Sequence, residues 1–143
     1  MNFKALTRFF DIFKPEFHIY TDGSQKGKWG SWAFVITQGE NILHEASGCV
    51  SKANSNRMEF QAAIEALRYV KAGTKARLYS DSRILINAVN SANERPQANE
   101  DQLAGIDELI ADRQITWIWV KAHAGNRFNE RCDELCVRAR TNK

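Results

Sequence analysis

The sequence predicts an α/β fold in which a five-stranded mixed sheet is flanked by helices. Three strand-like segments come first, and helical segments then alternate with two further strand-like segments, in the order βββ-α-β-α-α-β-α. A meander followed by strand–helix alternation is typical of a sheet that is antiparallel in its first half and parallel in its second. The chain has 143 residues, which suits one domain.

The first half of the fold is predicted from segments in which aromatic and β-branched residues alternate with polar ones. The predicted strands cover 17–22, 32–37 and 42–48. A turn at 39–41 joins the last two strands. Apolar residues at helical spacing then predict a helix over 56–71, and Gly73 ends it.

The second half alternates strands with helices. The predicted elements are a strand over 76–80, helices over 82–91 and 100–112, a strand over 115–120 and a last helix from about 129. In the helix over 82–91, the residues expected to face inward are Ile84, Leu85, Ala88 and Val89. A polar loop that contains Pro96 covers 93–99. The loop 121–128 leads to the last helix, which Asn129 can cap.

Composition narrows the class of protein. Hydrophobic residues make up 43% and charged residues 26%, as in ordinary globular domains. The net charge of +3 permits nucleic acid as a partner but does not demand it. No apolar run approaches the roughly 18 residues of a membrane span, so no membrane partner is expected. The start at Met1 and the compact length favour a standalone protein, and nothing demands more than a monomer.

The three cysteines, Cys49, Cys132 and Cys136, form no disulfide framework, since their number is odd. Zinc bound through Cys132 and Cys136 would need two more ligands, and His123 alone is too few. Buried free thiols in a reducing cytosol are the better interpretation, so we expect the protein in the cytoplasm.

Residues 1–15 are predicted to form an N-terminal extension. Charged residues at Lys4, Arg8, Asp11 and Lys14 interrupt its apolar positions, so it lacks the continuous hydrophobic region of a signal peptide. It could form a short amphipathic helix that ends before Pro15, or it could be a loose leader.

Four acidic residues fall at the ends of predicted elements. Asp22 and Asp81 end the first and fourth strands, whereas Glu59 and Asp133 lie in the first turns of the first and last helices. Ligands of α/β sheets collect at strand ends, so these carboxylates could converge. Convergent carboxylates favour a hard divalent cation such as Mg²⁺. Taken singly, each of the four residues is more often a turn, cap or helix-dipole residue.

The sequence context resembles type 1 ribonuclease H. The motifs that carry this resemblance are 20–24 (YTDGS), 56–59 (NRME) with 62–67, 79–82 (YSDS), 119–125 (WVKAHAG) and 129–135 (NERCDEL). They follow the order of that family and span nearly the whole chain. The resemblance implies a ribonuclease H-like fold, with the catalytic domain at 16–143 after the extension.

The resemblance also implies a reaction and its residues. Asp22, Glu59, Asp81 and Asp133 would bind two Mg²⁺ ions, with Mn²⁺ as a possible substitute, and the four carboxylates and His123 would be catalytic. His123 would assist proton transfer or product departure, although a loop histidine alone is more often a bystander. The enzyme would be an endonuclease that hydrolyses the RNA strand of RNA–DNA hybrids and leaves 3′-hydroxyl and 5′-phosphate ends.

Contacts to the RNA–DNA hybrid are implied for a second group of residues. By resemblance, Gly23, Ser24, Gln25 and Asn56 would lie against the RNA strand, whose 2′-hydroxyls distinguish it from DNA. Asn56 could instead, or as well, be the N-cap of its helix. The basic residues of the first turn, Lys26 and Lys28, could meet phosphates, or they could be ordinary solvated residues.

Several positions depart from the family pattern. The first turn, 25–30, is short and basic where many members have a Gly-Asn-Pro-Gly-rich loop, and Ser55 stands where many have a second Asn. The segment 90–101 is nearly neutral where many members insert a basic protrusion. Hybrid binding could then depend on Lys4, Arg8 and Lys14 of the extension. Ala122 replaces a Gly before His123, which would stiffen that loop.

Three other functions fit parts of the pattern. Another nuclease of this fold, such as an integrase or junction resolvase, also uses clustered carboxylates, but the 56–59 motif and His123 speak against it. A non-catalytic hybrid-binding module would not need all four carboxylates. A cation-binding structural domain would show no salt-dependent binding of hybrid.

Overall fold

The computed structural model describes residues 16–143. The predictions made for 1–15, an amphipathic helix or leader and a role in hybrid binding, lie outside the described residues. The boundary between extension and catalytic domain therefore stays a prediction.

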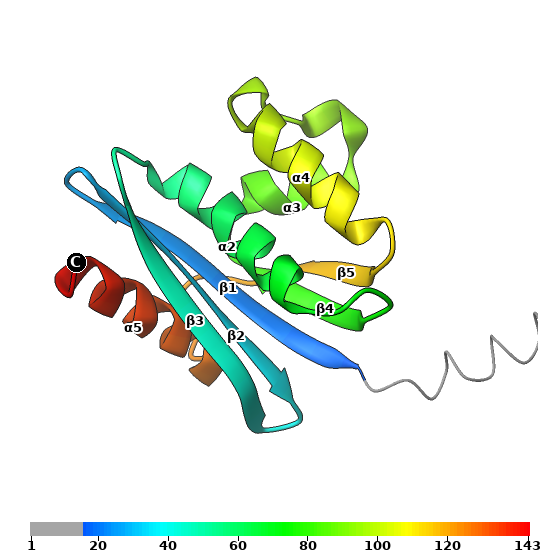
Figure 1. Ribbon diagram of the computed structural model, residues 1–143, viewed down its shortest axis with the longest axis horizontal. Coiled ribbons are helices and arrows are strands. Elements are labelled where there is room, and N and C mark those ends of the chain that lie inside the picture. Colours follow the sequence, from blue (N-terminus) through cyan, green and yellow to red (C-terminus); the bar gives the residue numbers. More distant parts are fainter. Residues whose placement is uncertain (1–15) are drawn as a thin grey trace, which may run out of the picture.

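Five strands, four α-helices and two short 3₁₀ turns follow one another along the described chain (Figure 1). They are β1 (Phe17–Lys26), β2 (Trp29–Gln38), β3 (Asn41–Ser51), α2 (Ser55–Tyr69), β4 (Lys75–Ser80), α3 (Arg83–Asn90), η1 (Ala92–Glu94), η2 (Gln97–Asn99), α4 (Glu100–Ile110), β5 (Gln114–Trp119) and α5 (Arg127–Thr141). The strands form one sheet in the order β3-β2-β1-β4-β5. The predicted α/β fold with a five-stranded sheet is thus confirmed.

The sheet is mixed, and its two halves meet at β1. The pairs β1–β2 and β2–β3 are antiparallel, whereas β1–β4 and β4–β5 are parallel. The parallel pairing of β1 with β4 stops at Tyr20 and Tyr79, although β1 continues to Lys26 beside β2. A crevice lies between β1 and β4 beyond this pair, and it is lined by Asp22 of β1 and by Asp81, which follows β4.

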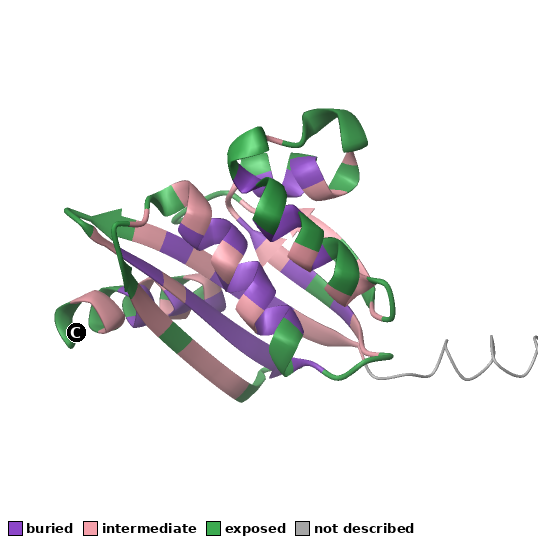
Figure 2. Cartoon of the chain, turned by 45° about the horizontal axis from the view of Figure 1, so that its top comes forward, coloured by how far each residue is buried: buried purple, intermediate pink, exposed green. Residues whose placement is uncertain are grey.

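Helices cover both faces of the sheet. Helices α2, α3 and α4 lie on one face and α5 on the other, against β1, β2 and β3 (Figures 1 and 2). The larger core, on the α2 side, is built around Ile19, Phe60, Leu67, Leu78 and Leu85. The smaller core, on the α5 side, consists of Tyr20, Ala33, Val35, Phe128, Cys132, Leu135 and Cys136. Burial of these apolar surfaces fixes the helices against the sheet.

The first hairpin is longer than predicted. β1 and β2 extend to a two-residue turn, in which Lys26 pairs with Trp29 and Gly27 adopts a φ of +59°. A two-residue hairpin loop with Gly at its first central position suits the twist of the flanking strands, so pairing continues to the tip. Asp22 consequently lies inside β1 and not at its end.

Helix boundaries also differ from the prediction, for reasons of capping. Asn54, and not Asn56, caps α2, since its side chain accepts a hydrogen bond from the Arg57 amide. Asn126, and not Asn129, caps α5 by accepting from two amides. Both helices therefore begin earlier than predicted, and Glu59 and Asp133 lie in their second turns. At the other end of α2, the backbone is already extended at Val70, before Gly73.

One of the four residues predicted to face inward in α3 does not do so. Ile84 is 51% exposed, whereas Ile86 is buried on the core side beside Leu85 and Ala88. The expected burial of the thiols is confirmed for Cys132 and Cys136, which are fully buried on α5, but not for Cys49 on β3, which is half-buried. None of the helices within 16–143 has both the length and the apolar character needed to cross a bilayer.

Candidate active site

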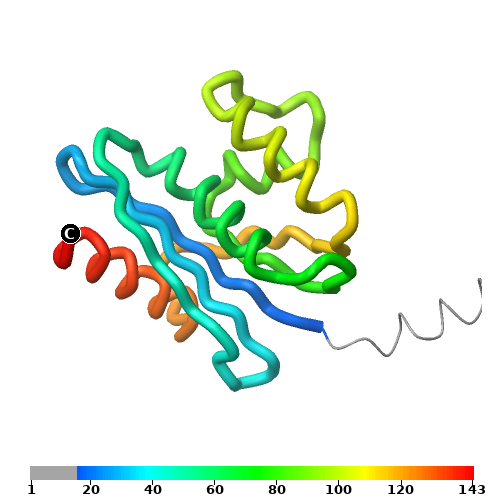
Figure 3. Tube along the Cα trace, viewed as in Figure 1, coloured from blue at the N-terminus to red at the C-terminus, as the bar shows by residue number. Residues whose placement is uncertain are grey.

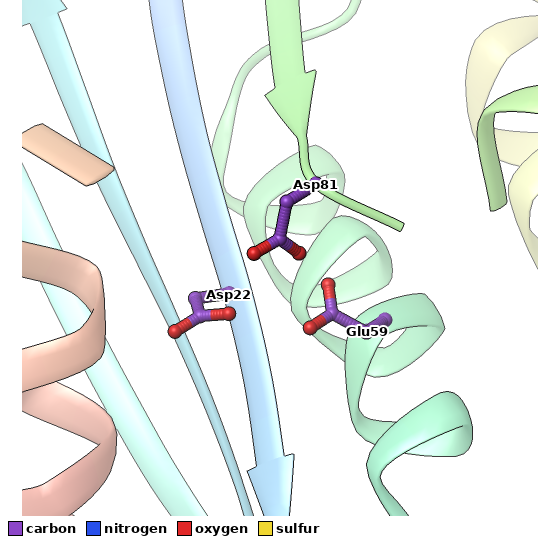
Figure 4. Close-up of side chains that lie close together, drawn as sticks. All are labelled: Asp22, Glu59 and Asp81. Carbon is purple, nitrogen blue, oxygen red and sulfur yellow. The ribbon is translucent and has the colours of Figure 1, made fainter. Parts of the chain in front are cut away.

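Three of the predicted carboxylates come together at the crevice between β1 and β4. Asp22 comes from β1, Asp81 follows the last residue of β4, and Glu59 comes from α2. One ligand oxygen from each lies within 4.8 Å of those of the other two. Figure 4 shows the three carboxylates directed toward one another.

The position of Glu59 depends on a close approach of α2 to β1. The Gly23 amide donates a hydrogen bond of 3.0 Å to Oε1 of Glu59, and the Ser80 hydroxyl donates one of 3.4 Å to Oε2. A Cβ atom at position 23 would lie 2.3 Å from the backbone of both Met58 and Glu59. Gly23 is therefore required for the approach that places the Glu59 side chain at the crevice.

Asp81 is held at the start of α3. The Trp119 indole donates a hydrogen bond of 3.1 Å to the Asp81 carbonyl, and the Arg83 guanidinium lies 3.9 Å from the centroid of that indole. The Ser82 hydroxyl caps α3 by accepting from the Leu85 amide. These contacts fix the backbone that carries the carboxylate. Trp119 was not among the predicted site residues, although it is the first residue of the 119–125 motif.

The carboxylates disfavour one another's ionised forms. Burial, and then the charges of Asp81 and Asp133, raise the pKa of Asp22 to about 7. Burial and the charges of Asp22 and Asp81 likewise raise the pKa of Glu59. Burial also raises the pKa of Asp81, although the nearby charge of His123 opposes the shift. Without a cation, the cluster thus holds protons that ordinary surface carboxylates would release.

Asp133 and His123 line the same pocket from the other side. The pocket is formed by Asp22, Asp81, His123, Asn126, Asn129 and Asp133, among others. Asp133 lies outside the group of three whose oxygens meet within 4.8 Å, although its charge acts on both aspartates. His123 is exposed on the loop before α5, with a φ of +54°. Four of the five predicted catalytic residues thus line one pocket, and Glu59 lines a neighbouring pocket to which Asp81 also contributes.

The donor set fits a hard divalent cation. All four acidic groups offer oxygen ligands, and three of them are already near the spacing of ligands around one ion. A divalent charge at this place would favour the ionised carboxylates and so oppose the burial and the repulsion that raise the pKa of the three clustered residues. Within residues 16–143, the two thiols nearest the cluster are engaged elsewhere, because Cys132 and Cys136 donate to the carbonyls of Tyr20 and Asp22.

The residues predicted to contact substrate extend from the pocket toward the first hairpin. Ser24 lies opposite Ser31, with hydroxyl oxygens 3.0 Å apart, and Gln25, Lys26 and Lys28 are exposed. Asn56 is half-buried at the start of α2, and its side-chain amide donates a hydrogen bond of 2.9 Å to Oδ1 of Asn99. Its own Oδ1 is buried and has no hydrogen-bond partner among the described residues. Their contacts with nucleic acid stay predictions.

Known proteins match this chain over most of its length. The sequence model of the family described as RNase H matches residues 14–141. A ribonuclease H of Caldanaerobacter subterraneus subsp. tengcongensis is 39% identical over 134 residues, which are 83% of this chain and 87% of that protein. A ribonuclease H of Symbiobacterium thermophilum is 40% identical over 133 residues, which are 82% and 89% of the two chains.

The fold also has solved counterparts. Ribonuclease H1 of the halophilic archaeon Halobacterium salinarum superposes with a TM-score of 0.78 at 21% identity, over 90% of this chain and 99% of that one. LC11-RNase H1, isolated from compost, superposes with a TM-score of 0.77 at 23% identity, over 90% and 98%. Family match, sequence identity and fold agree with the motifs found in the sequence. The chain is therefore a member of the ribonuclease H family of enzymes.

Proposed function

We propose that this enzyme is an endonuclease that hydrolyses the RNA strand of RNA–DNA hybrids. The observation that carries the proposal is the convergence of Asp22, Glu59 and Asp81 within 4.8 Å at the crevice between β1 and β4. Membership of the ribonuclease H family supports the substrate class. A further support is that LC11-RNase H1, which shares this fold with a TM-score of 0.71, has been solved in complex with an RNA/DNA hybrid.

The proposed cofactor is a pair of Mg²⁺ ions, for which Mn²⁺ could substitute. Asp22, Glu59 and Asp81 would hold the ions together with Asp133, which faces the pocket from α5. Bound there, divalent cations would supply a water of lowered pKa for attack on the phosphodiester and Lewis acidity for the leaving oxygen. In the proposed outcome the 3′ oxygen leaves, so the products carry 3′-hydroxyl and 5′-phosphate ends.

The protein's own contribution is to orient the carboxylates and to exchange protons beside them. Hydrogen bonds from Gly23 and Ser80 hold both oxygens of Glu59 in fixed directions, which preorganises the site. His123, on its exposed loop, would pass a proton to or from solvent at the edge of the pocket. Asn56 with Gly23, Ser24 and Gln25 would distinguish RNA from DNA, and Lys26 and Lys28 would contact phosphates.

A cleavage panel tests this function. End-labelled RNA–DNA hybrid, double-stranded RNA, single-stranded RNA and duplex DNA are each incubated with Mg²⁺, Mn²⁺ or EDTA. We expect cleavage of the RNA strand of the hybrid alone, only with metal, and none by Asp81→Asn. Glu108→Gln, on the exposed side of α4, is the matched control and should cut normally. Mapping the ends of the products tests the proposed end chemistry.

Each rival function predicts a different result. Cleavage of duplex DNA would indicate another carboxylate-dependent nuclease of the same fold. Binding of hybrid without cleavage would indicate a non-catalytic binding module. The proposal also includes action as a monomer in the cytoplasm, which sedimentation and cell fractionation would check.

A further inference from the structure

Five basic side chains gather at the end of the molecule that holds the β1–β2 turn. Lys26 and Lys28 belong to the turn, Lys52 follows β3, and Arg140 and Lys143 lie at the C-terminus of α5. The Lys52 amide donates to the Lys28 carbonyl at 2.6 Å, and the C-terminus lies beside the hairpin (Figure 3). We refer to Lys26, Lys28, Lys52, Arg140 and Lys143 as the cationic end.

Acidic residues are missing from the chain segments that form this end. The segments 23–39, 46–58 and 135–143 contain no Asp or Glu. Within residues 16–143, none of the five side chains of the cationic end forms an ion pair. Most other described arginines form ion pairs, as Arg57 does with Asp101 and Arg138 with Glu134. A repulsive, unpaired cluster of this kind gains stability when an anion with several charges binds.

Arg140 is positioned to bind such an anion. Its Nη1 donates to the Ser24 and Ser31 hydroxyls, which face α5 from β1 and β2. Its Nε and Nη2 form no hydrogen bond with any described residue, so one edge of the guanidinium is free. A planar guanidinium with free donors matches the oxygens of a phosphate group.

Trp29 organises two further cations. The Lys28 and Lys143 ammonium groups lie 5.3 and 5.1 Å from the centroid of its ring. The Lys143 ammonium group also donates a hydrogen bond of 2.7 Å to the Arg140 carbonyl, so Lys143 is held next to Arg140. Cation–π contact restricts both ammonium groups without neutralising them, so their charges remain available to a ligand.

The cationic end lies in line with the candidate active site. Asp22 and Ser24 are two residues apart in β1, so their side chains lie on the same side of the strand. Helix α5 runs along this strand, since Cys136 contacts the Asp22 carbonyl and Arg140 contacts Ser24. Lys26 is four residues beyond Asp22 on the same strand, a separation of about 13 Å. A duplex held at the carboxylates therefore needs to extend only a few base pairs to reach these cations.

We propose that the cationic end binds the sugar–phosphate backbone of the hybrid a few base pairs to one side of the cleaved bond. This inference rests on the proposed function, and it adds Arg140, Lys143 and Lys52 to the substrate-binding surface, with Trp29 holding two of the ammonium groups in place. Its contacts would be with phosphates alone, so they would affect affinity and processing of long hybrids but not the choice of RNA over DNA.

The salt dependence of binding tests the proposal. Binding of a long hybrid to the double variant Arg140→Gln/Lys143→Gln is measured by fluorescence anisotropy over a series of salt concentrations, with Asp81→Asn introduced in all proteins to prevent cleavage. Two lost phosphate contacts should reduce the slope of log Kd against log salt by about 1 to 2 and weaken binding roughly tenfold at low salt. Arg138→Gln, on the same helix but paired with Glu134, should change the slope by much less.

A second readout separates lost contacts from local damage. In proteins that keep Asp81, the double variant should show a raised KM on a long hybrid and an unchanged kcat. On a hybrid too short to reach the cationic end, wild type and variant should be equal. Arg140→Lys should retain most of the salt slope, and Lys143→Gln alone, at an exposed terminal residue, should lower it without a change in Tm.

The outcomes distinguish the two proposals. If wild type cuts no hybrid, the proposed function fails, whatever the salt slope. If wild type cuts hybrid but the double variant has the wild-type slope and KM on long hybrids, the cationic end does not bind substrate. A deficit of equal size on short and long hybrids would also overturn the inference, since it would place the effect at the carboxylates.

Discussion

The Gly23 amide lies 3.0 Å from Oε1 of Glu59, and the same residue leaves no space for a side chain against α2. This contact between Gly23 and α2 has two consequences. The amide orients a carboxylate of the cluster, and the missing Cβ lets α2 approach β1 closely enough to bring that carboxylate to Asp22. The glycine of the YTDGS motif is therefore explained by packing, whether or not it also contacts a sugar.

Gly23→Ala should accordingly damage both the fold and the site. The new methyl group would overlap the backbone of Met58 and Glu59 at 2.3 Å, and a backbone cannot rotate away as a flexible side chain can. We expect a loss of about 2–4 kcal/mol in the free energy of unfolding and weaker Mg²⁺ binding by the folded protein. Urea denaturation and calorimetric Mg²⁺ titration measure the two effects.

Gly105→Ala provides a control of opposite sign. Gly105 lies inside α4, and a Cβ there meets no atom within 4 Å. Alanine favours a helix interior over glycine, so this variant should be more stable by up to about 1 kcal/mol. Equal stability of Gly23→Ala and wild type would show that α2 can move without cost, contrary to the packing argument.

Neutralising Asp22 should stabilise the metal-free protein at high pH. Because folding raises the pKa of Asp22 from 3.8 to about 7, the stability that its protonated form contributes is present below pH 4 and is lost as the pH rises through about 7. In EDTA, Asp22→Asn should thus match wild type near pH 4 and exceed it by about 1–3 kcal/mol above pH 7. Thermal melts at several pH values measure the difference.

Bound metal should reduce this difference in stability. Mg²⁺ should raise the Tm of wild type at pH 8 and should leave the Tm of Asp22→Asn nearly unchanged, because binding to the folded state alone stabilises it. Glu108→Gln, at an exposed position of α4, should follow wild type in both experiments. A pH-independent gap between Asp22→Asn and wild type would mean that the charge of Asp22 does not oppose folding.

The sequence allowed the fold and the site to be predicted to different depths. Hydrophobic periodicity was enough to predict the strands of the sheet and the helices on its two faces, because each element buries one apolar side. The catalytic candidates came from motifs and not from periodicity, since an isolated Asp or Glu at an element end has many ordinary uses. Placement of Asp22, Glu59 and Asp81 in one cluster required the three-dimensional pairing of β1 with β4.

The remaining details could not be predicted, because neighbouring residues of similar chemistry could fill the same structural role. Two asparagines in the segment 54–56 can each cap a helix, and only the geometry selects Asn54 over Asn56. Ile84 and Ile86 are equally apolar, so the sequence pattern does not decide which of them faces the core. Lys26 and Lys28 of the cationic end were predicted to meet phosphates, but Lys52, Arg140 and Lys143 were not, because they come from distant segments and belong to no motif.

Arg131 of the NERCDEL motif has a structural use that predicts a stability effect. It donates to both oxygens of Glu45 on β3, at 2.7 and 2.9 Å, and so ties α5 to an edge strand. Arg131→Met, which keeps an apolar stem, should reduce the free energy of unfolding by about 1–2 kcal/mol at neutral pH. The hydrogen bond from Arg131 lowers the pKa of Glu45, so this difference should disappear as the pH falls through that lowered value. A persisting difference at the lowest pH would assign the effect to packing.

His123 should affect turnover without affecting the metal. It lines the pocket from an exposed loop, and it lies outside the cluster of three carboxylates. Asparagine tolerates positive φ, so His123→Asn preserves the backbone while it removes the titratable ring. We expect kcat on hybrid to fall by roughly 10- to 100-fold, with the Mg²⁺-dependent rise in Tm unchanged. His44→Asn, whose ring stacks on Tyr69 with centroids 3.8 Å apart, is the matched control and should keep full activity. An unchanged kcat in His123→Asn would make this histidine a bystander, whereas a lost Mg²⁺ effect on Tm would make it part of the metal site.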